Sequence, residues 1–402
     1  MKCKIVYVLS HPLVERDYIR YGIKYMLDNT IAVDVIDAFD LFWPSKDRTT
    51  IQAVTDKVGD IYYVRTIRQL LNKLQSYEDP IRVVLITSVD RTFYQIVSQL
   101  NVYKIPVATI RVGAIPLPLD SIGGTFLIRL KVMFERGGVL GGFKKMYHKI
   151  RSSLYQMGEQ ARLDFVFYGG AKALSQAPRI IKEAEHKISV HTLDYDLLLS
   201  DVSSSNRKPY ILFLDQFLPH HPDVYLASDR HEMVGVEIVD QYYACLNSFF
   251  SMLEEQHGCC VVVAAHPRSD YTGRDERFQG REVIRDSVTE LVKHSKICVT
   301  YCSTAVNLAV LFGKPLVFIY MDSFNSILGG YTRAVAEAMA HELSGDFWLI
   351  DKEYIENREI SVNKEAYLRY IDNYIKEYES VDGLFWEEVL KRLIYDEEVI
   401  CT

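Results

Sequence analysis

Val261-Val262-Val263-Ala264-Ala265-His266-Pro267 is a short apolar run that ends in a proline. Its length and its β-branched residues are typical of a buried parallel strand whose carboxyl end meets a cleft. A second stretch repeats the layout, since Ile297–Tyr301 is strand-like, Cys302-Ser303-Thr304 forms a turn, and residues 305–312 have a helical pattern. Two consecutive strand–loop–helix units of this kind predict an α/β domain with a mainly parallel sheet.

Strand and helix signals also alternate through the first half of the chain. The runs Ile5–Leu9, Ile31–Ile36, Val83–Ile86 and Ile105–Ile110 are strand-like, with helical patterns between them. The polar run Asp201–Lys208 has no apolar periodicity and is the best linker candidate. We therefore expect two Rossmann-like domains, residues 1–200 and residues 209–402 with terminal helices, that face a central cleft.

Composition restricts the class of protein. With 402 residues, 49% of them apolar and 25% charged, the chain is long enough for two globular cores, and no stretch of about 20 apolar residues predicts a membrane span. The residues Met1–Ser10 resemble a first buried strand more than a signal peptide, so we expect a cytoplasmic protein. A net charge of −7 argues against nucleic acid as a partner, and the seven scattered cysteines predict reduced thiols.

The loops at His266 and at Ser303-Thr304 together predict an anion site. A helix N-terminus carries unpaired N–H groups and partial positive charge, which favours a phosphate, and Ser303 or Thr304 would be the N-cap of the helix after the second strand. In open α/β sheets, ligands bind outside the carboxyl ends of the strands, where both loops would lie. The alternative is that both residues are purely structural: Ser303 caps its helix, and His266 forms part of a turn.

Asp215 follows a third strand-like run, Tyr210–Leu214, and is the candidate catalytic carboxylate. A base that removes a proton from a hydroxyl nucleophile must lie within hydrogen-bond reach, and partial burial raises its pKa. Alternatively, Asp215 starts a turn and bonds its own backbone. His220 and His221 either tune this carboxylate or lie on the surface.

The order of an acidic residue after a strand, then His-Pro, then a Ser-Thr pair resembles bacterial GT-B-fold glycosyltransferases that use CMP-activated ulosonic acids. These include sialyltransferases and relatives that act on Kdo or pseudaminic acid. The resemblance covers mainly residues 210–320 and implies that Asp215 is the catalytic carboxylate, that His266 contacts the nucleotide phosphate, and that Ser303-Thr304 bind it. The sialyltransferase pattern has two acids followed by glycine, whereas this chain has Asp215-Gln216-Phe217. The base assignment and the stereochemical outcome therefore stay open.

The resemblance implies a metal-independent transferase of bacterial surface polysaccharide synthesis without a cofactor. It would move a nonulosonic acid or Kdo-like sugar from a CMP donor to a glycan or lipid-linked acceptor. Because CMP leaves with one phosphate, donors at His266 and the Ser303 loop could stabilise the charge that develops there without a metal. Pro267 and Arg268 belong to the same donor loop, and Arg268 either pairs with the sugar carboxylate or faces solvent.

The first domain would be the acceptor side. His11 and Arg16 follow its first strand, and both are candidate acceptor contacts. The segments 10–17 and 191–196 also look like uncharacterised proteins of bacterial capsule and O-antigen loci. Asp194-Tyr195-Asp196 has the spacing of a metal motif, but we expect it to lie away from the donor phosphate.

Residues 123–151 combine seven basic residues, a single acid and many apolar ones, which suits contact with an anionic inner-membrane surface or a lipid-linked acceptor. An ordinary helix pair with a solvated basic face is the alternative. Rival functions are a transferase that uses CDP-glycerol or a nucleotide-diphosphate sugar, a nucleotide-sugar epimerase, and a non-catalytic nucleotide-binding or membrane-docking scaffold.

Overall fold

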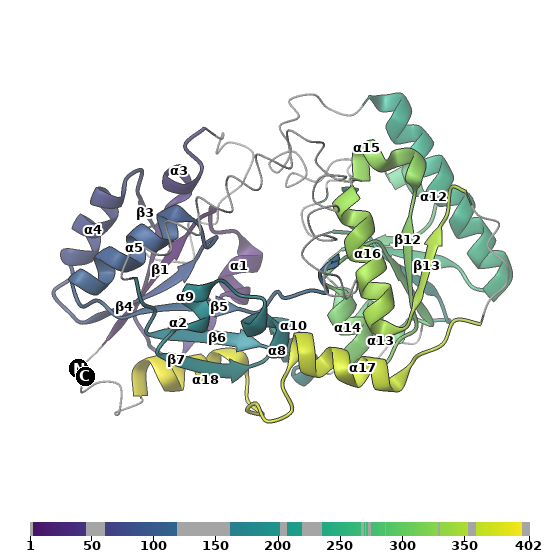
Figure 1. Ribbon diagram of the computed structural model, residues 1–402. Coiled ribbons are helices and arrows are strands. Elements are labelled where there is room, and N and C mark those ends of the chain that lie inside the picture. The colour runs from purple at the N-terminus through teal and green to yellow at the C-terminus, as the bar shows by residue number, and fades with distance from the viewer. Residues whose placement is uncertain are drawn as a thin grey trace, which may run out of the picture. The chain divides into compact units, whose positions relative to one another are not determined.

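The computed structural model describes residues 3–45, 61–118, 161–201, 207–218, 235–266, 269, 271, 275–285, 287–328, 330–352 and 359–395. These residues form two compact units (Figure 1). The first unit contains the described residues up to Ala114, those of 161–193, and those from Lys376 onward. The second contains residues 115–118 and the described part of Asp194–Ile375. The units divide between Leu193 and Asp194, before the polar run in which the sequence placed the linker.

The first unit has a seven-stranded parallel sheet in the order β3-β2-β1-β4-β5-β6-β7. From β1 the chain adds strands on one side and then returns to β4 on the other, so the sheet has its topological switch point between β1 and β4. The strands are β1 (Lys4–Leu9), β2 (Val33–Asp37), β3 (Ile61–Tyr63), β4 (Ile81–Ile86), β5 (Val107–Arg111), β6 (Phe165–Gly169) and β7 (His186–Val190).

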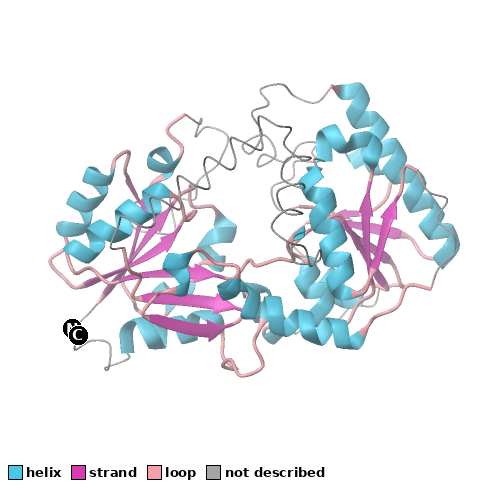
Figure 2. Cartoon of the chain, viewed as in Figure 1, coloured by secondary structure: helices cyan, strands magenta, loops and turns pink. Residues whose placement is uncertain are grey.

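Helices surround this sheet (Figure 2). Two of them begin at side-chain caps, because Thr66 accepts a hydrogen bond from the Gln69 N–H at 3.2 Å and Asp90 accepts one from the Phe93 N–H at 3.0 Å. The helices are α1 (Glu15–Arg20), α2 (Ile23–Asp28), α3 (Phe39–Phe42), α4 (Ile67–Gln75), α5 (Arg91–Val102), α8 (Ala171–Ser175), α9 (Arg179–Lys182) and α18 (Phe385–Leu390), with a π-helical turn η6 (Lys391–Tyr395).

Helix α18 packs in the core of the first unit, whereas the sequence analysis placed all the terminal helices in the domain of residues 209–402. The Trp386 ring lies edge-on to Tyr7 of β1 at 6.3 Å, and its Nε1 donates to the Arg20 carbonyl at 2.9 Å. At Gly22, where φ is +65°, a Cβ would overlap the Trp386 ring. An amphipathic pattern predicts that a helix covers a sheet but does not say which sheet, and this explains the difference.

The second unit has a six-stranded parallel sheet in the order β10-β9-β8-β11-β12-β13. Its switch point lies between β8 and β11, and every residue of β8, β9, β11 and β12 is buried. Continuous apolar strands are what a parallel sheet covered on both faces requires. The strands are β8 (Ile211–Leu214), β9 (Val261–Ala264), β10 (Val283–Ile284), β11 (Ile297–Thr300), β12 (Leu316–Tyr320) and β13 (Asp346–Leu349).

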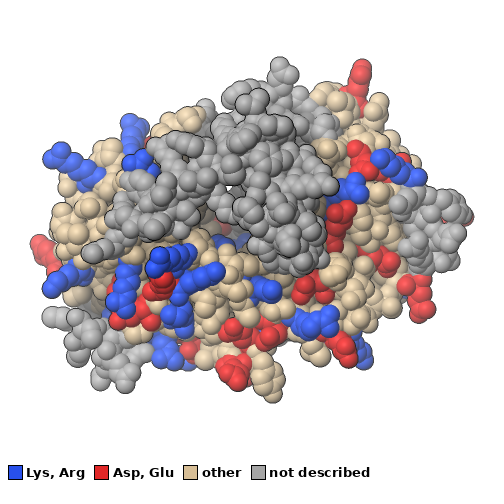
Figure 3. All heavy atoms as spheres, in the orientation of Figure 1, with Lys and Arg blue, Asp and Glu red and all other residues tan. Residues whose placement is uncertain are grey.

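Helix α12 is the longest described helix of the second unit and ends at Gly258, whose φ of +63° is accessible to glycine at no steric cost. No helix among the described residues is long and apolar enough to cross a membrane. Acidic and basic side chains are interspersed over the described surface seen in Figure 3. The helices are α10 (Leu193–Leu199), α12 (Val236–His257), α13 (Val288–His294), α14 (Val306–Leu311), α15 (Asn325–Leu328), α16 (Gly330–Leu343) and α17 (Lys364–Tyr370).

Candidate functional site

Three predicted loops lie at the carboxyl edge of the second sheet. Asp215 directly follows β8, His266 lies two residues beyond β9, and Ser303 lies three residues beyond β11. Strand β8 pairs with β9 on one side and with β11 on the other, and all three are parallel. The structure therefore brings these residues to the ends of three neighbouring strands, at the switch point where α/β sheets bind ligands.

Asp215 is buried, with 7% of its surface exposed. One carboxylate oxygen accepts from the Phe217 N–H at 2.9 Å, and the other accepts from the Tyr271 hydroxyl at 2.5 Å. Burial raises the pKa of Asp215, while the Tyr271 hydroxyl and the N–H groups of Phe217, His266 and Gln216 act in the opposite direction. The bond to Phe217, a residue with a φ of +52°, is the turn contact that the alternative interpretation of Asp215 predicts.

A group of buried tyrosines surrounds Asp215, and the sequence analysis did not identify it. Besides Tyr271, it contains Tyr242 of α12 and Tyr301 after β11, whose hydroxyls are 2.9 Å apart. Burial and the Asp215 carboxylate raise the pKa of Tyr271, so it stays a neutral hydrogen-bond donor. These residues come from three separate segments, and no spacing in the sequence relates them to one another.

Gln216 connects the two loops at the switch point. Its Oε1 accepts from the Cys302 N–H at 2.8 Å, and its Nε2 lies 3.7 Å from the Cys302 sulfur. Burial raises the pKa of Cys302 to about 11, so the thiol is neutral. The residue at which the chain departs from the sialyltransferase pattern thus ties the loop after β8 to the loop after β11.

The turn between β11 and α14 differs in detail from the prediction. Helix α14 begins at Val306, with Ala305 as its N-cap and no capping side chain, so neither Ser303 nor Thr304 is the N-cap. The reason is a tight turn in which the Val306 N–H donates to the Ser303 carbonyl at 3.2 Å and delays the start of the helix. The Ser303 hydroxyl accepts from the Ala305 N–H at 3.2 Å, and Thr304 is exposed at the edge of the sheet.

His266 is half-buried, and its carbonyl accepts from the Ser269 N–H at 2.8 Å. Ser269 is 8% exposed, and its hydroxyl makes no hydrogen bond with another described residue. A buried hydroxyl without a partner is costly, so a bound anion or water would stabilise this position. The other predicted positions here, Pro267 and Arg268, lie outside the described residues, as do residues 123–151 and 220–221 and the side chain of Arg16.

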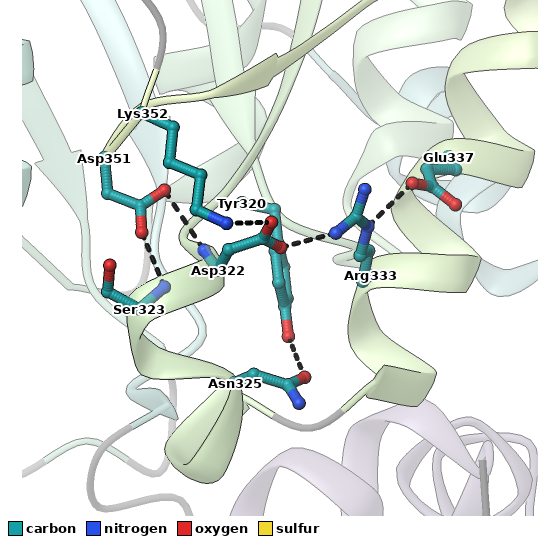
Figure 4. A network of polar contacts seen from close by, with 8 residues as sticks. All are labelled: Tyr320, Asp322, Ser323, Asn325, Arg333, Glu337, Asp351 and Lys352. Atoms are coloured by element: carbon teal, nitrogen blue, oxygen red, sulfur yellow. Dashed lines mark hydrogen bonds and ion pairs between the residues drawn. The ribbon is translucent and has the colours of Figure 1, made fainter. Parts of the chain in front are cut away.

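A polar network at the ends of β12 and β13 is a further feature that the sequence analysis missed (Figure 4). Asp322 pairs with Arg333 at 2.5 Å and with Lys352 at 2.8 Å. The hydrogen bond from Lys352, together with Arg333, lowers the pKa of Asp322. Asp351 accepts from the Asp322 N–H at 3.1 Å and from the Ser323 N–H at 2.6 Å. The network holds the turn after β12 against the turn after β13 and against α16.

His11 lies at the switch point of the first sheet, two residues after β1. Its Nε2 is 3.4 Å from Asp17 Oδ2 and 3.2 Å from the Tyr21 hydroxyl. The side chain of Asp17 is 0% exposed, whereas that of His11 is 28% exposed. The sequence analysis named His11 but not its partner Asp17. One signal in the sequence could have identified Asp17. A strand is followed by a His-Pro segment, and the next helix carries a carboxylate in its first turn.

Among the described residues, no group of three or more His, Cys, Asp or Glu side chains is arranged to hold a metal ion. Asp194, the first residue of the sequence pair with metal spacing, accepts a hydrogen bond from Asn307 Nδ2 at 2.9 Å. Both residues belong to the second unit, whereas the sequence analysis placed Asp194 in the first domain. The expectation of a metal-independent site stays a prediction.

Solved structures of other proteins are similar to this chain. The glycosyltransferase SnogD from Streptomyces nogalater is 11% identical, with a TM-score of 0.50 over 98% of this chain and 100% of that chain. UDP-GlcNAc 2-epimerase from Methanocaldococcus jannaschii is 13% identical, with a TM-score of 0.47 over 98% and 100% of the two chains. MurG from Acinetobacter baumannii is 8% identical, with a TM-score of 0.47 over 96% and 98%.

No family model and no curated protein sequence matches the chain. Its two parallel-sheet Rossmann-like units and its likeness to SnogD define the GT-B fold, as the sequence predicted.

Proposed function

We propose that this protein is a glycosyltransferase that moves a sugar from a nucleotide donor to a glycan or lipid-linked glycan during synthesis of a bacterial surface polysaccharide. One observation carries the proposal: the loops with Asp215, His266 and Ser303-Thr304 follow three neighbouring strands of one parallel sheet. The GT-B fold, which SnogD shares, supports the class of reaction.

The proposed donor is a CMP-linked nonulosonic or Kdo-like acid. When such a donor reacts, negative charge develops on a single phosphate, and a few hydrogen-bond donors on one short edge are enough to stabilise it. His266, the Ser269 hydroxyl and the turn at Ser303-Thr304 are the groups of this edge that suit that task. In the proposal Arg268 pairs with the sugar carboxylate, and no metal or cofactor takes part.

The acceptor would bind the first unit near His11 and Arg16. We propose that the protein works in the cytoplasm and contacts the anionic inner-membrane surface through residues 123–151, whose basic and apolar composition suits such a surface. Cosedimentation with anionic liposomes tests this contact. Replacement of Lys144, Lys145 and Lys149 by alanine should release the protein, and unchanged sedimentation would remove the membrane part of the proposal.

Thermal shift with CMP, CDP and UDP tests the donor class. A ligand at about 100 times its Kd stabilises a protein by about 2.7 kcal/mol, so CMP should raise the melting temperature. Ser303→Ala should reduce this shift, whereas the matched change Ser175→Ala, in the first unit, should leave it unchanged. Stabilisation by UDP but not by CMP or CDP would rule out the CMP donor. If no nucleotide stabilised the protein and no sugar were transferred, the proposed function would be wrong.

A further inference from the structure

Arg111 is the last residue of β5 and lies at the carboxyl edge of the first sheet. Strand β5 pairs with β4, so Arg111 is one strand away from the switch point between β1 and β4. Ala108 and Ile110 of the same strand pack into the core of the first unit, and the alternation of side chains along a strand therefore directs Arg111 to the other face. Ligands of open parallel sheets bind outside this edge.

The guanidinium of Arg111 has no counter-charge among the described residues. Its Nε is buried without a hydrogen-bond partner there, and no described carboxylate forms an ion pair with it. Burial lowers the pKa of Arg111. Because a donor that leaves water without a new partner costs free energy, an oxyanion that bound this guanidinium would stabilise the protein.

A carboxylate associated with the next strand is engaged elsewhere. Tyr168 of β6 lies opposite Arg111 in the strand register, and its hydroxyl donates to Glu377 Oε2 at 3.2 Å. The same carboxylate oxygen accepts from the Ser189 hydroxyl. Glu377 thus holds β6 and β7 together and does not neutralise Arg111.

The chain after Arg111 leaves room for a ligand. Gly113 is exposed, and a Cβ added to it would have no described atom within 4 Å. Arg111 itself is only partly buried, so a ligand can reach it from solvent. A guanidinium presents five N–H donors in a planar fork that fits two oxygens of a carboxylate or a phosphate.

We infer that Arg111 binds an oxyanion of the acceptor and that the acceptor is therefore an anionic glycan. The inference rests on the proposed function. Two sources share this chemistry, namely the phosphate that links a glycan to its lipid and the carboxylate of an acidic sugar. In either case Arg111 determines specificity, because a neutral glycan would leave the guanidinium without a partner.

Titration with small sugars, in the absence of a donor, tests the anion site. The probes are glucose 1-phosphate, methyl glucuronide and methyl glucoside, which offer a phosphate, a carboxylate and no charge on similar rings. The 15Nε–1H NMR signal of Arg111, identified by its absence in Arg111→Lys, should shift with at least one anion and not with methyl glucoside. A shift with the phosphate alone supports the lipid-linking phosphate as the source, and a shift with the glucuronide alone supports an acidic sugar. No shift with either anion, or an equal shift with methyl glucoside, would overturn the inference.

Arg111→Gln separates recognition from folding. Loss of a hydrogen bond between charged groups should weaken binding of the effective anion by about 10–100-fold. The melting temperature should be no lower than that of the wild type, because the guanidinium supports no other described residue. The matched change Arg179→Gln removes the same charge from the surface of the first unit, where Arg179 pairs with Glu183 at 2.7 Å, and should leave binding unchanged. Wild-type affinity in Arg111→Gln would overturn the inference.

Transfer assays connect the anion site to the reaction. Arg111→Gln should raise the KM for an anionic acceptor by about 10–100-fold and leave the KM for the donor unchanged. If the wild type used neutral and anionic acceptors equally well, the inference would be overturned while the proposed function stood. An anion-dependent Arg111 signal in a protein that transferred no sugar would overturn the proposed function and leave the anion site in place.

Discussion

The Cys302 N–H donates a hydrogen bond to Gln216 Oε1 at 2.8 Å, which joins the loops on either side of the switch point of the second sheet. The Thr300 hydroxyl adds a contact across the same pair of strands, to the Leu214 carbonyl at 3.4 Å. In the sialyltransferase pattern an acid stands at the position of Gln216. Here a neutral amide fills that position and fixes the geometry between the proposed catalytic carboxylate and the proposed phosphate loop.

Gln216→Ala should therefore weaken donor binding, and it should lower the free energy of unfolding to a smaller extent. A half-buried N–H that loses its partner costs about 1–3 kcal/mol, so the free energy of unfolding should fall by an amount in this range. The KM for the donor should rise because the Ser303 turn is no longer tied to β8. Donor titration and urea unfolding measure the two effects, with Gln75→Ala on the exposed face of α4 as the control. An unchanged KM would show that the bridge does not position the donor.

Tyr271→Phe should destabilise the protein in a pH-dependent way. The pKa of Asp215 is higher in the folded state than in the unfolded state, so the folded state binds the carboxyl proton more tightly. The contribution of Asp215 to the free energy of unfolding therefore decreases as pH rises from the unfolded pKa through the folded pKa. Loss of the Tyr271 hydrogen bond raises the pKa further. A hydrogen bond to a charged group contributes about 1.5–3 kcal/mol, so the loss should be of this size at pH 7 and should shrink as Asp215 is protonated.

Unfolding in urea between pH 4 and pH 7 measures this effect. Tyr210→Phe is a matched control, because the Tyr210 hydroxyl donates to the neutral Leu291 carbonyl at 2.7 Å. The loss in free energy of unfolding caused by Tyr210→Phe should not vary over this range of pH. If the loss in free energy of unfolding caused by Tyr271→Phe were also independent of pH, Asp215 would not be ionised at neutral pH.

His266→Ala should lower kcat by about 10²–10³-fold, which is the typical effect of removing one donor to a developing negative charge. The KM for the acceptor should stay near its wild-type value, because His266 belongs to the donor side of the proposal. Steady-state transfer assays with each substrate varied in turn separate these constants. A change confined to the acceptor KM would contradict the assignment.

Asp215→Asn tests whether Asp215 is the general base of the proposed transfer. The amide keeps an oxygen that can accept from the Phe217 N–H, so the turn after β8 should survive. A general base at Asp215 requires that kcat fall by about 10²–10⁴-fold in this variant. Steady-state transfer rates of Asp215→Asn and the wild type measure this loss, and a rate within about tenfold of the wild type would contradict the assignment.

Asp322→Asn should destabilise the second unit at neutral pH but not in acid. Lys352 and Arg333 lower the folded pKa of Asp322, so its contribution is present above the unfolded pKa and is lost as pH falls through the folded pKa. Melting temperatures of the variant and the wild type should therefore converge as pH decreases from 7 toward 3. A difference that persisted at pH 3 would indicate packing and not charge as its cause.

The sequence predicted the architecture because the relevant signals are local. Runs such as Val261–Ala264 and Leu316–Tyr320 are short and apolar at every position, which is typical of a parallel strand covered on both faces. The same strand ends identified the loops of Asp215, His266 and Ser303. The hydrogen bonds and turns within these loops depend on contacts between residues that are distant in the sequence. No local pattern contains that information.

Three differences show this limit. Ser303 does not cap α14, because a tight turn intervenes. The partner of Asp215 is Tyr271, a residue 56 positions away in the chain, and the bond forms only when β8 and β9 lie side by side. Helix α18 covers the first sheet because Gly22 leaves space for Trp386, and these two residues are more than three hundred positions apart in the chain.

The packing of α18 also sets an order of events during synthesis on the ribosome. Tyr7 of β1 emerges more than three hundred residues before Trp386, whose ring packs edge-on against it. Domains generally fold as units while the chain is synthesised. The first sheet, however, lacks the helix that covers this apolar face until the second unit has been made. The first unit is consequently completed only after the second has been made, and a ribosome that stalled before residue 385 would release a chain with that face exposed to chaperones and proteases.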